Sequence, residues 1–259
     1  MTRRRFVDGR LGAVVLPILG ILVLIAIWWL GVLAFHVQPI LLPTPLAVAK
    51  VFVNSPTEML GHLRASAVET LEGYGFAVVA GLAIALAVAS SRTIDRMFTP
   101  LLVAANAVPK VALAPLVLVW FGLGQVSRVI LVFLVCFFPI VVSAVAGFTT
   151  TPADLAELAR SLSASRRQTF LKVRVPGALP QIFVGLKVAV GLAVIGATVA
   201  ELSGADQGLM YAVQAYGGQG EPAQAIAALV LLAVLSIVLY YLLVALERRL
   251  LPWARETAG

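Results

Sequence analysis

Residues Val129–Phe148 read VILVFLVCFFPIVVSAVAGF, a run of 20 positions without a charged side chain. About 20 apolar residues in a helix cross the hydrocarbon core of a bilayer. This run falls within one of six apolar segments, which lie near 12–35, 67–90, 98–121, 127–148, 180–202 and 223–246. The sequence therefore predicts an all-α, polytopic membrane protein with about six transmembrane helices, folded as a single domain over residues 1–259.

The composition agrees with a lipid environment. Of the 259 residues, 61% are hydrophobic and 12% are charged, whereas soluble domains carry about 25% charged residues. The net charge of +7 is also found in nucleic-acid-binding proteins. Here the basic residues cluster in short segments between the apolar runs, which is a membrane-topology pattern and argues against a nucleic-acid partner. With one cysteine, Cys136, and two histidines, no Cys/His metal cluster is expected.

The distribution of basic residues predicts the orientation. Four segments hold 14 of the 19 Lys and Arg residues, namely 1–11, 91–97, 149–179 and 247–259. The opposite side carries only Lys50, Arg64 and Arg128. Because basic loops remain in the cytoplasm, we expect both termini there.

Two predicted spans carry small residues at every fourth position. These rows are Gly73, Ala77, Gly81, Ala85 and Ala89 in the second span, and Gly185, Ala189, Ala193 and Ala197 in the fifth. Such rows let helices approach closely in lipid, either for static packing or as a surface that slides. One step beyond each row lies an acid, Glu69 or Glu201. These acids are candidates for the translocation path, and the alternative is a structural salt bridge or interfacial solvation.

The two long segments on the outer side differ in their expected structure. Within 36–66, Pro45 is suited to open a short helix over 46–52, which we expect to lie at the outer interface. The segment 203–222 contains Asp206 and Glu221 but no Lys or Arg, and we interpret it as an outer loop.

The segment 149–179 is the one long cytoplasmic insert. Thr151 and Pro152 are suited to begin a helix that runs to Leu162, and a second short helix is predicted over 166–173. Pro176 and Pro180 are expected to stop that second helix before the fifth span. From its composition alone, the insert suits either a docking surface for a partner protein or a helical lid on anionic headgroups.

The insert also resembles a known sequence motif. The stretch ELARSLSASRRQTFLKVRVPGALPQIFVGLKVA (Glu157–Ala189) resembles the EAA loop of binding-protein-dependent ABC importer permeases, whose pattern is E-A-A-x-x-x-G followed by I-x-L-P. Glu157 and Ala159 match the pattern, Leu158 replaces its first Ala, and Ser163 stands at its Gly. The closing motif is matched by 173–176, VRVP, with Val in place of both its Ile and its Leu.

The similarity extends through residues 40–253. The stretches VPKVALAPLVLVWFGLGQVSRV (Val108–Val129) and FFPIVVSAVAGF (Phe137–Phe148) resemble the third and fourth spans of the nitrate/sulfonate/taurine subfamily. The resemblance implies a MetI-like importer permease bundle, commonly a homodimer, with cytoplasmic coupling helices. These helices would dock an ABC ATPase dimer that binds ATP and Mg²⁺, while an extracytoplasmic binding protein delivers the solute.

This chain has no G-x-x-x-x-G-K-[ST] phosphate loop, so no cofactor and no ATPase activity of its own are expected. The docking residues implied by the resemblance are Glu157, Ala159, Arg160, Leu162, Ser163, Ala164, Arg166 and Arg167. For Glu157 the alternative is an ordinary surface position, and for the arginines it is cytoplasmic retention alone. A serine resists the left-handed turn that a glycine allows, so Ser163 is predicted to cap the second short helix instead.

Two lysines lie inside predicted spans. Lys110, flanked by Pro109 and Pro115, is expected near the bilayer centre, where it would either face the translocation path and attract an anion or pair with a carboxylate or carbonyl. Lys187, a further candidate for the translocation path, is shallower and is expected to reach the cytoplasmic surface. A secondary transporter or channel is the alternative function, although no inverted repeat supports it.

Overall fold

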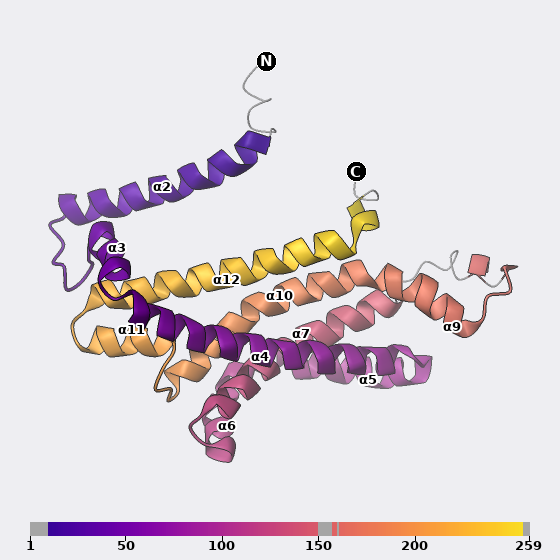
Figure 1. The fold of residues 1–259 in the computed structure, drawn as a ribbon. Coiled ribbons are helices and arrows are strands. Elements are labelled where there is room, and N and C mark those ends of the chain that lie inside the picture. The colour runs from indigo at the N-terminus through magenta and orange to yellow at the C-terminus, as the bar shows by residue number, and fades with distance from the viewer. Residues whose placement is uncertain (1–9, 150–156, 160, 256–259) are drawn as a thin grey trace. The chain divides into compact units, whose positions relative to one another are not determined.

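The computed structural model describes residues 10–149, 157–159 and 161–255, which are helical and contain no strand. Figure 1 traces the chain. It forms two compact units, one of Met1–Leu60 with Ala212–Val230 and one of Gly61–Tyr211 with Leu231–Gly259. Three helices, α4 (Pro56–Ala89), α11 (Leu209–Gly218) and α12 (Pro222–Leu250), have residues in both units.

The first unit contains α2 (Arg10–Ala34) and α3 (Pro45–Asn54). Pro45 opens α3, and the Thr44 hydroxyl accepts a hydrogen bond from the Ala47 N–H at 3.2 Å. This N-cap satisfies a backbone donor that the helix cannot pair internally. The structure therefore confirms the short helix predicted after Pro45.

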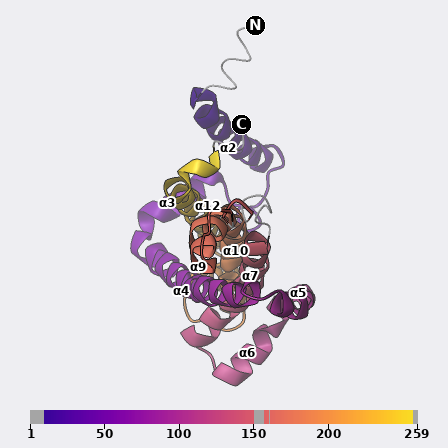
Figure 2. The ribbon, with the colours of Figure 1, turned by 90° about the vertical axis from the view of Figure 1, so that its right-hand side faces the viewer.

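The second unit is built around α7 (Gln125–Thr149), which lies beside α4 and α10 (Val175–Leu202) (Figures 1 and 2). Both rows of small residues pack on α7. A Cβ atom on Gly73 would overlap Val132, and one on Gly185 would overlap Ser143. Ala77, Ala85, Ala189 and Ala193 are fully buried. In this structure the rows serve close helix packing, the simpler of the two interpretations.

Five helices in the described part of the chain are long and apolar enough to cross a membrane, and a bent pair raises the count to six. The bent pair is α5 (Arg92–Ala107) followed by η1 (Lys110–Leu113) and α6 (Ala114–Phe121), with an angle of 75° at the break. The predicted third span over 98–121 is thus not one straight helix. Pro109 explains the break, because it lacks an N–H and forces the residue before it, Val108, into extended geometry (ψ 128°).

Two outer segments contain more helix than the sequence suggested. α4 begins at Pro56 rather than near residue 67, with the proline at the first helical position, where its missing N–H costs nothing. The predicted loop 203–222 contains α11. The start of α4 is too polar to read as part of a span, and the ten residues of α11 are too few to cross a bilayer, so the pattern of apolar spans did not predict either helix.

The fifth span departs from prediction at its prolines. α9 (Arg166–Thr169) continues through a five-residue π turn, η2 (Phe170–Arg174), directly into α10. The Val175 N–H bonds to the Phe170 carbonyl, five residues back. This widened turn absorbs Pro176 near the start of α10, and Pro180 is tolerated inside it. The prediction that these prolines stop the second short helix is wrong.

Candidate functional site

The predicted docking segment forms a tight helix end around Ser163. The N–H of Leu162 bonds to the carbonyl of Leu158 at 3.1 Å, and the N–H of Ala164 reaches back five residues to the carbonyl of Ala159 at 2.9 Å. Ser163 has a φ of +55°. This arrangement is a Schellman motif, in which a left-handed residue closes a helix. Ser163 therefore adopts the conformation that the family glycine allows, despite its side chain.

The prediction that Ser163 caps the second short helix is consequently wrong. The cap is Ser165, whose hydroxyl accepts a hydrogen bond from the Gln168 N–H at 3.2 Å. The Gln168 side chain in turn accepts from the Ser165 N–H at 2.8 Å. This reciprocal pair is a capping box, and its S-x-x-Q spacing is visible in the sequence. The motif fixes where the second helix begins.

Four of the six docking residues whose side chains the structure describes are exposed. Glu157, Ser163 and Arg167 lie on the surface, and the side chain of Leu162 is 74% exposed. Ala159 is buried and Ala164 is half-buried. Arg160, and with it the predicted helix start at Thr151 and Pro152, lies outside the described residues, as does the side chain of Arg166.

The acid Glu69 forms a buried ion pair with the start of α7. The Nε of Arg128 donates to Oε1 of Glu69 at 2.6 Å, and both side chains are at most 6% exposed. A second carboxylate, that of Asp206, lies 3.7 Å from the Arg128 guanidinium and is exposed. The structural salt bridge was one of the two interpretations of Glu69 from sequence. Its partner could not be found from spacing, because Arg128 is 59 residues away.

The acid Glu201 holds the start of α11. Its carboxylate accepts hydrogen bonds from the Ser66 hydroxyl and, at 2.6 Å, from the Met210 N–H. Ser66 also accepts from the Leu209 N–H at 2.8 Å. A carboxylate on the unpaired N–H groups of a helix start is favoured by the helix dipole. Gly208 (φ +120°) makes the contact possible, since a Cβ there would overlap the Glu201 carboxylate.

The two lysines both have partners within the second unit. The ammonium of Lys110 donates to the Asn106 carbonyl and, at 3.1 Å, to the Asn106 side-chain oxygen. It also lies 4.9 Å from the ring centroid of Phe138, a cation–π distance. Lys187 pairs with Glu247 of α12 at 2.9 Å, with both side chains 23% exposed. Of the two interpretations of Lys110, the structure therefore agrees with the one in which it pairs with a carbonyl. Lys187 is paired with a carboxylate of the bundle.

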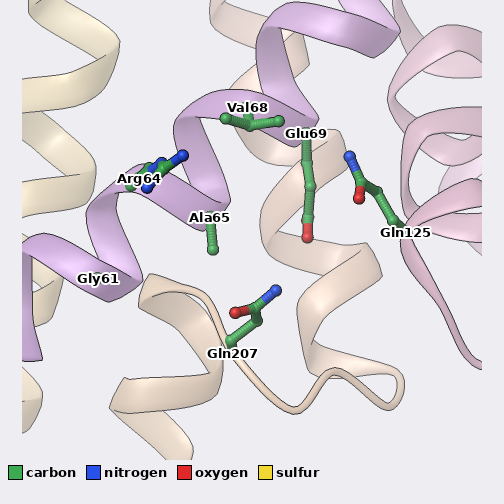
Figure 3. A pocket seen from close by; sticks show the side chains of 7 residues that line it. All are labelled: Gly61, Arg64, Ala65, Val68, Glu69, Gln125 and Gln207. Atoms are coloured by element: carbon green, nitrogen blue, oxygen red, sulfur yellow. The ribbon is translucent and has the colours of Figure 1, made fainter.

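A cavity of about 400 Å³ opens beside the Glu69–Arg128 pair. It is lined by Gly61, Arg64, Ala65, Val68, Glu69, Gln125 and Gln207. Figure 3 shows the Glu69 carboxylate between the amide groups of Gln125 and Gln207. The lining comes from α4, the start of α7 and the loop before α11, so all of it lies within the second unit. Glu201 and Lys187 are not part of this lining, and neither is Lys110.

Comparisons with known proteins agree with the sequence motifs. The family model described as "Binding-protein-dependent transport system inner membrane component" matches residues 77–252. The chain is 34% identical over 241 residues to the formylaminopyrimidine transport permease protein ThiX of Halalkalibacterium halodurans, covering 93% of this chain and 96% of that protein. It is 32% identical over 250 residues to the taurine transport system permease protein TauC of Escherichia coli, covering 94% and 91%. The riboflavin transport system permease protein RibX of Chloroflexus aurantiacus is 32% identical over 243 residues, covering 92% and 91%.

Proposed function

Since this chain belongs to the family of binding-protein-dependent transport system inner membrane components, we propose that its segment 157–167 docks a separate ATPase subunit and couples ATP hydrolysis to solute import. The chain is the transmembrane permease subunit of an ABC importer for a small solute. It lies in the membrane and works with an ABC ATPase and a substrate-binding protein. ATP and Mg²⁺ would be bound by the ATPase alone.

Further features of the assembly belong to the same proposal. The solute is small and polar or anionic, and an extracytoplasmic binding protein delivers it. Two copies of this chain form one pathway in the cell membrane of a prokaryote, with both termini in the cytoplasm. The distribution of Lys and Arg supports this orientation, because it leaves the docking segment on the side where ATP is available.

The observation that carries the proposal is the hydrogen-bonded turn and capping box of the docking segment. A Schellman turn at Ser163 is followed at once by the Ser165 capping box. The second helix then continues through the π turn at Phe170–Arg174 into α10. Force applied at the docking segment therefore has a helical route into the membrane bundle. A flexible loop of the same length would dissipate it.

Leu162 offers a sharp test, because its side chain is apolar and 74% exposed in the docking segment. We expect Leu162→Asp to lower co-purification of the ATPase subunit at least tenfold, since burying a charge in a protein interface costs more than the 1.4 kcal/mol that a tenfold loss represents. ATP-dependent uptake into proteoliposomes should fall in parallel. Glu157→Ala and Arg160→Ala should lower substrate-stimulated ATPase activity without loss of expression.

The matched control is Leu250→Asp, because Leu250 is also an exposed leucine (51%) but lies at the end of α12. It should leave both ATPase binding and uptake close to the wild-type values. Unchanged ATPase binding by Leu162→Asp would remove this residue from the interface. Uptake against a gradient by this chain without any ATPase would refute the proposed function as a whole.

A further inference from the structure

Glu69 lines the cavity described above, and one of its two carboxylate oxygens has no hydrogen-bond partner among the described residues. Its Oε1 accepts from Arg128, whereas its Oε2 is buried and has no hydrogen-bond partner among the described residues. Glu69 is only 2% exposed. A buried polar atom without a partner costs about 1–3 kcal/mol, and such atoms in native structures call for an explanation. A ligand in the adjoining cavity would supply the missing donor.

The groups around this oxygen define which ligand would fit. Gln125 donates its amide N–H to Glu72 at 2.8 Å, which leaves its amide oxygen as a second acceptor in the cavity lining. Two acceptors, one of them a carboxylate, favour an ammonium or amino group, since charge-assisted hydrogen bonds are about twice as strong as neutral ones. Arg128 offsets one negative charge here, but Asp206 adds another beside it. The cluster of Glu69, Arg128 and Asp206 is therefore net negative.

Arg64 favours a negatively charged group on the same ligand. Its guanidinium is exposed and lines the same cavity, where it can bind a carboxylate, sulfonate or phosphate group. The volume of about 400 Å³ lies at the lower end of the 300–1,000 Å³ range of small-molecule sites. The cavity is therefore suited to a short solute that carries charges of both signs.

We infer that this cavity is a solute site in the permease for a small amphoteric molecule, with its ammonium group on Glu69 and Gln125 and its anionic group on Arg64. The inference rests on one part of the proposed function, namely that the solute passes through this chain. It assigns to the permease a part in solute selection beyond that of the binding protein. The site lies on the side that the basic-residue pattern assigns to the outside.

Three matched probes test this assignment on the permease–ATPase complex in detergent, without binding protein or nucleotide. They are 3-aminopropionate, propionate, which lacks the amino group, and propylamine, which lacks the carboxylate. Dissociation constants are measured by ligand-observed NMR. We expect 3-aminopropionate to bind at least tenfold more tightly than either of the other two.

Variants then locate the bound probe. Gln125→Leu should weaken 3-aminopropionate binding at least fivefold without touching the Glu69–Arg128 pair. Its control, Gln224→Leu, removes the same kind of contact, because Gln224 also donates to a glutamate at 2.8 Å but does not line the cavity. Arg64→Met should weaken binding similarly, and the exposed Lys50 provides its control as Lys50→Met.

The outcomes separate clearly. Equal binding of the three probes, no binding of any, or unchanged binding by both Gln125→Leu and Arg64→Met would overturn the inference and leave a water-filled cavity. Because binding is measured without ATP turnover, these results do not bear on coupling. If the ATPase subunit did not co-purify with the wild-type chain, that result would instead count against the proposed function.

Discussion

The buried pair of Arg128 and Glu69 provides the most quantitative test of the structure. Arg128→Met would leave the Glu69 carboxylate buried without its counter-charge. Removing one partner of a buried ion pair costs about 3–5 kcal/mol. With side chains only 6% and 3% exposed, Arg128 and Glu69 are buried deeply enough for this range to apply. Glu69 also lines a cavity that can admit water, so the lower end, about 3 kcal/mol, is expected.

The matched comparison is Lys187→Met, which removes the cation of a second pair within the same unit. Lys187 and Glu247 are each 23% exposed, so water solvates the remaining carboxylate and the cost should be about 0–1 kcal/mol. Free energies of unfolding of the purified protein, measured by denaturant titration in mixed micelles, give both values. The double variant Arg128→Met/Glu69→Leu should recover most of the loss, because no charge is then left unpaired.

Two results would refute this reasoning. If Arg128→Met and Lys187→Met lowered the free energy of unfolding equally, burial would not control the strength of the two pairs. If the loss of stability in the double variant equalled the sum of the losses from Arg128→Met and Glu69→Leu measured separately, the two charges would act independently. In that case the 2.6 Å contact between Arg128 and Glu69 would not be an energetically coupled pair.

Three further substitutions probe backbone and packing, each read as a change in thermal stability of the purified protein. Ser163→Gly should stabilise the docking turn by about 1 kcal/mol, because glycine adopts positive φ without a steric penalty; a lower melting temperature would contradict the left-handed turn. Gly185→Ala should destabilise the α7–α10 contact by about 1–3 kcal/mol, whereas Gly191→Ala, where the added Cβ meets nothing within 4 Å, should be neutral or stabilising; equal losses would argue against close packing. Gly208→Ala should lower stability, because its Cβ would displace the Glu201 carboxylate, and an unchanged melting temperature would show that this contact is dispensable.

The sequence predicted the elements whose determinants are local. Thr44 and Pro45 form an N-cap and a first helical position next to each other in the chain, and α3 begins there. The long apolar runs were predicted for the same reason, since about 20 apolar residues have one stable arrangement in lipid. The rows of small residues also follow from one helix at a time, although the partner helix, α7, could not be named.

The remaining features depend on contacts between distant residues. Glu201 and Ser66 hold the start of α11, and neither contact can be inferred from the sequence of 203–222 considered alone. Glu69 and Arg128 lie on different helices, and no spacing rule connects them. The continuation of helix through Pro176 depends on the π turn at Phe170–Arg174, and the rule that proline ends a helix does not anticipate such a turn.

The length of the fifth span connects these observations. The helix from Arg167 to Leu202 contains 36 residues, which corresponds to about 54 Å at 1.5 Å per residue. The hydrocarbon core needs only about 30 Å, so the helix is longer than one crossing requires. One end follows the Ser165 capping box, and the other end carries Glu201. Because a helix resists compression along its axis, movement of the proposed docking segment would reach Glu201 and the start of α11 unless the π turn bent. The π turn and Pro180 are thus the points where stiffness along this helix is lowest.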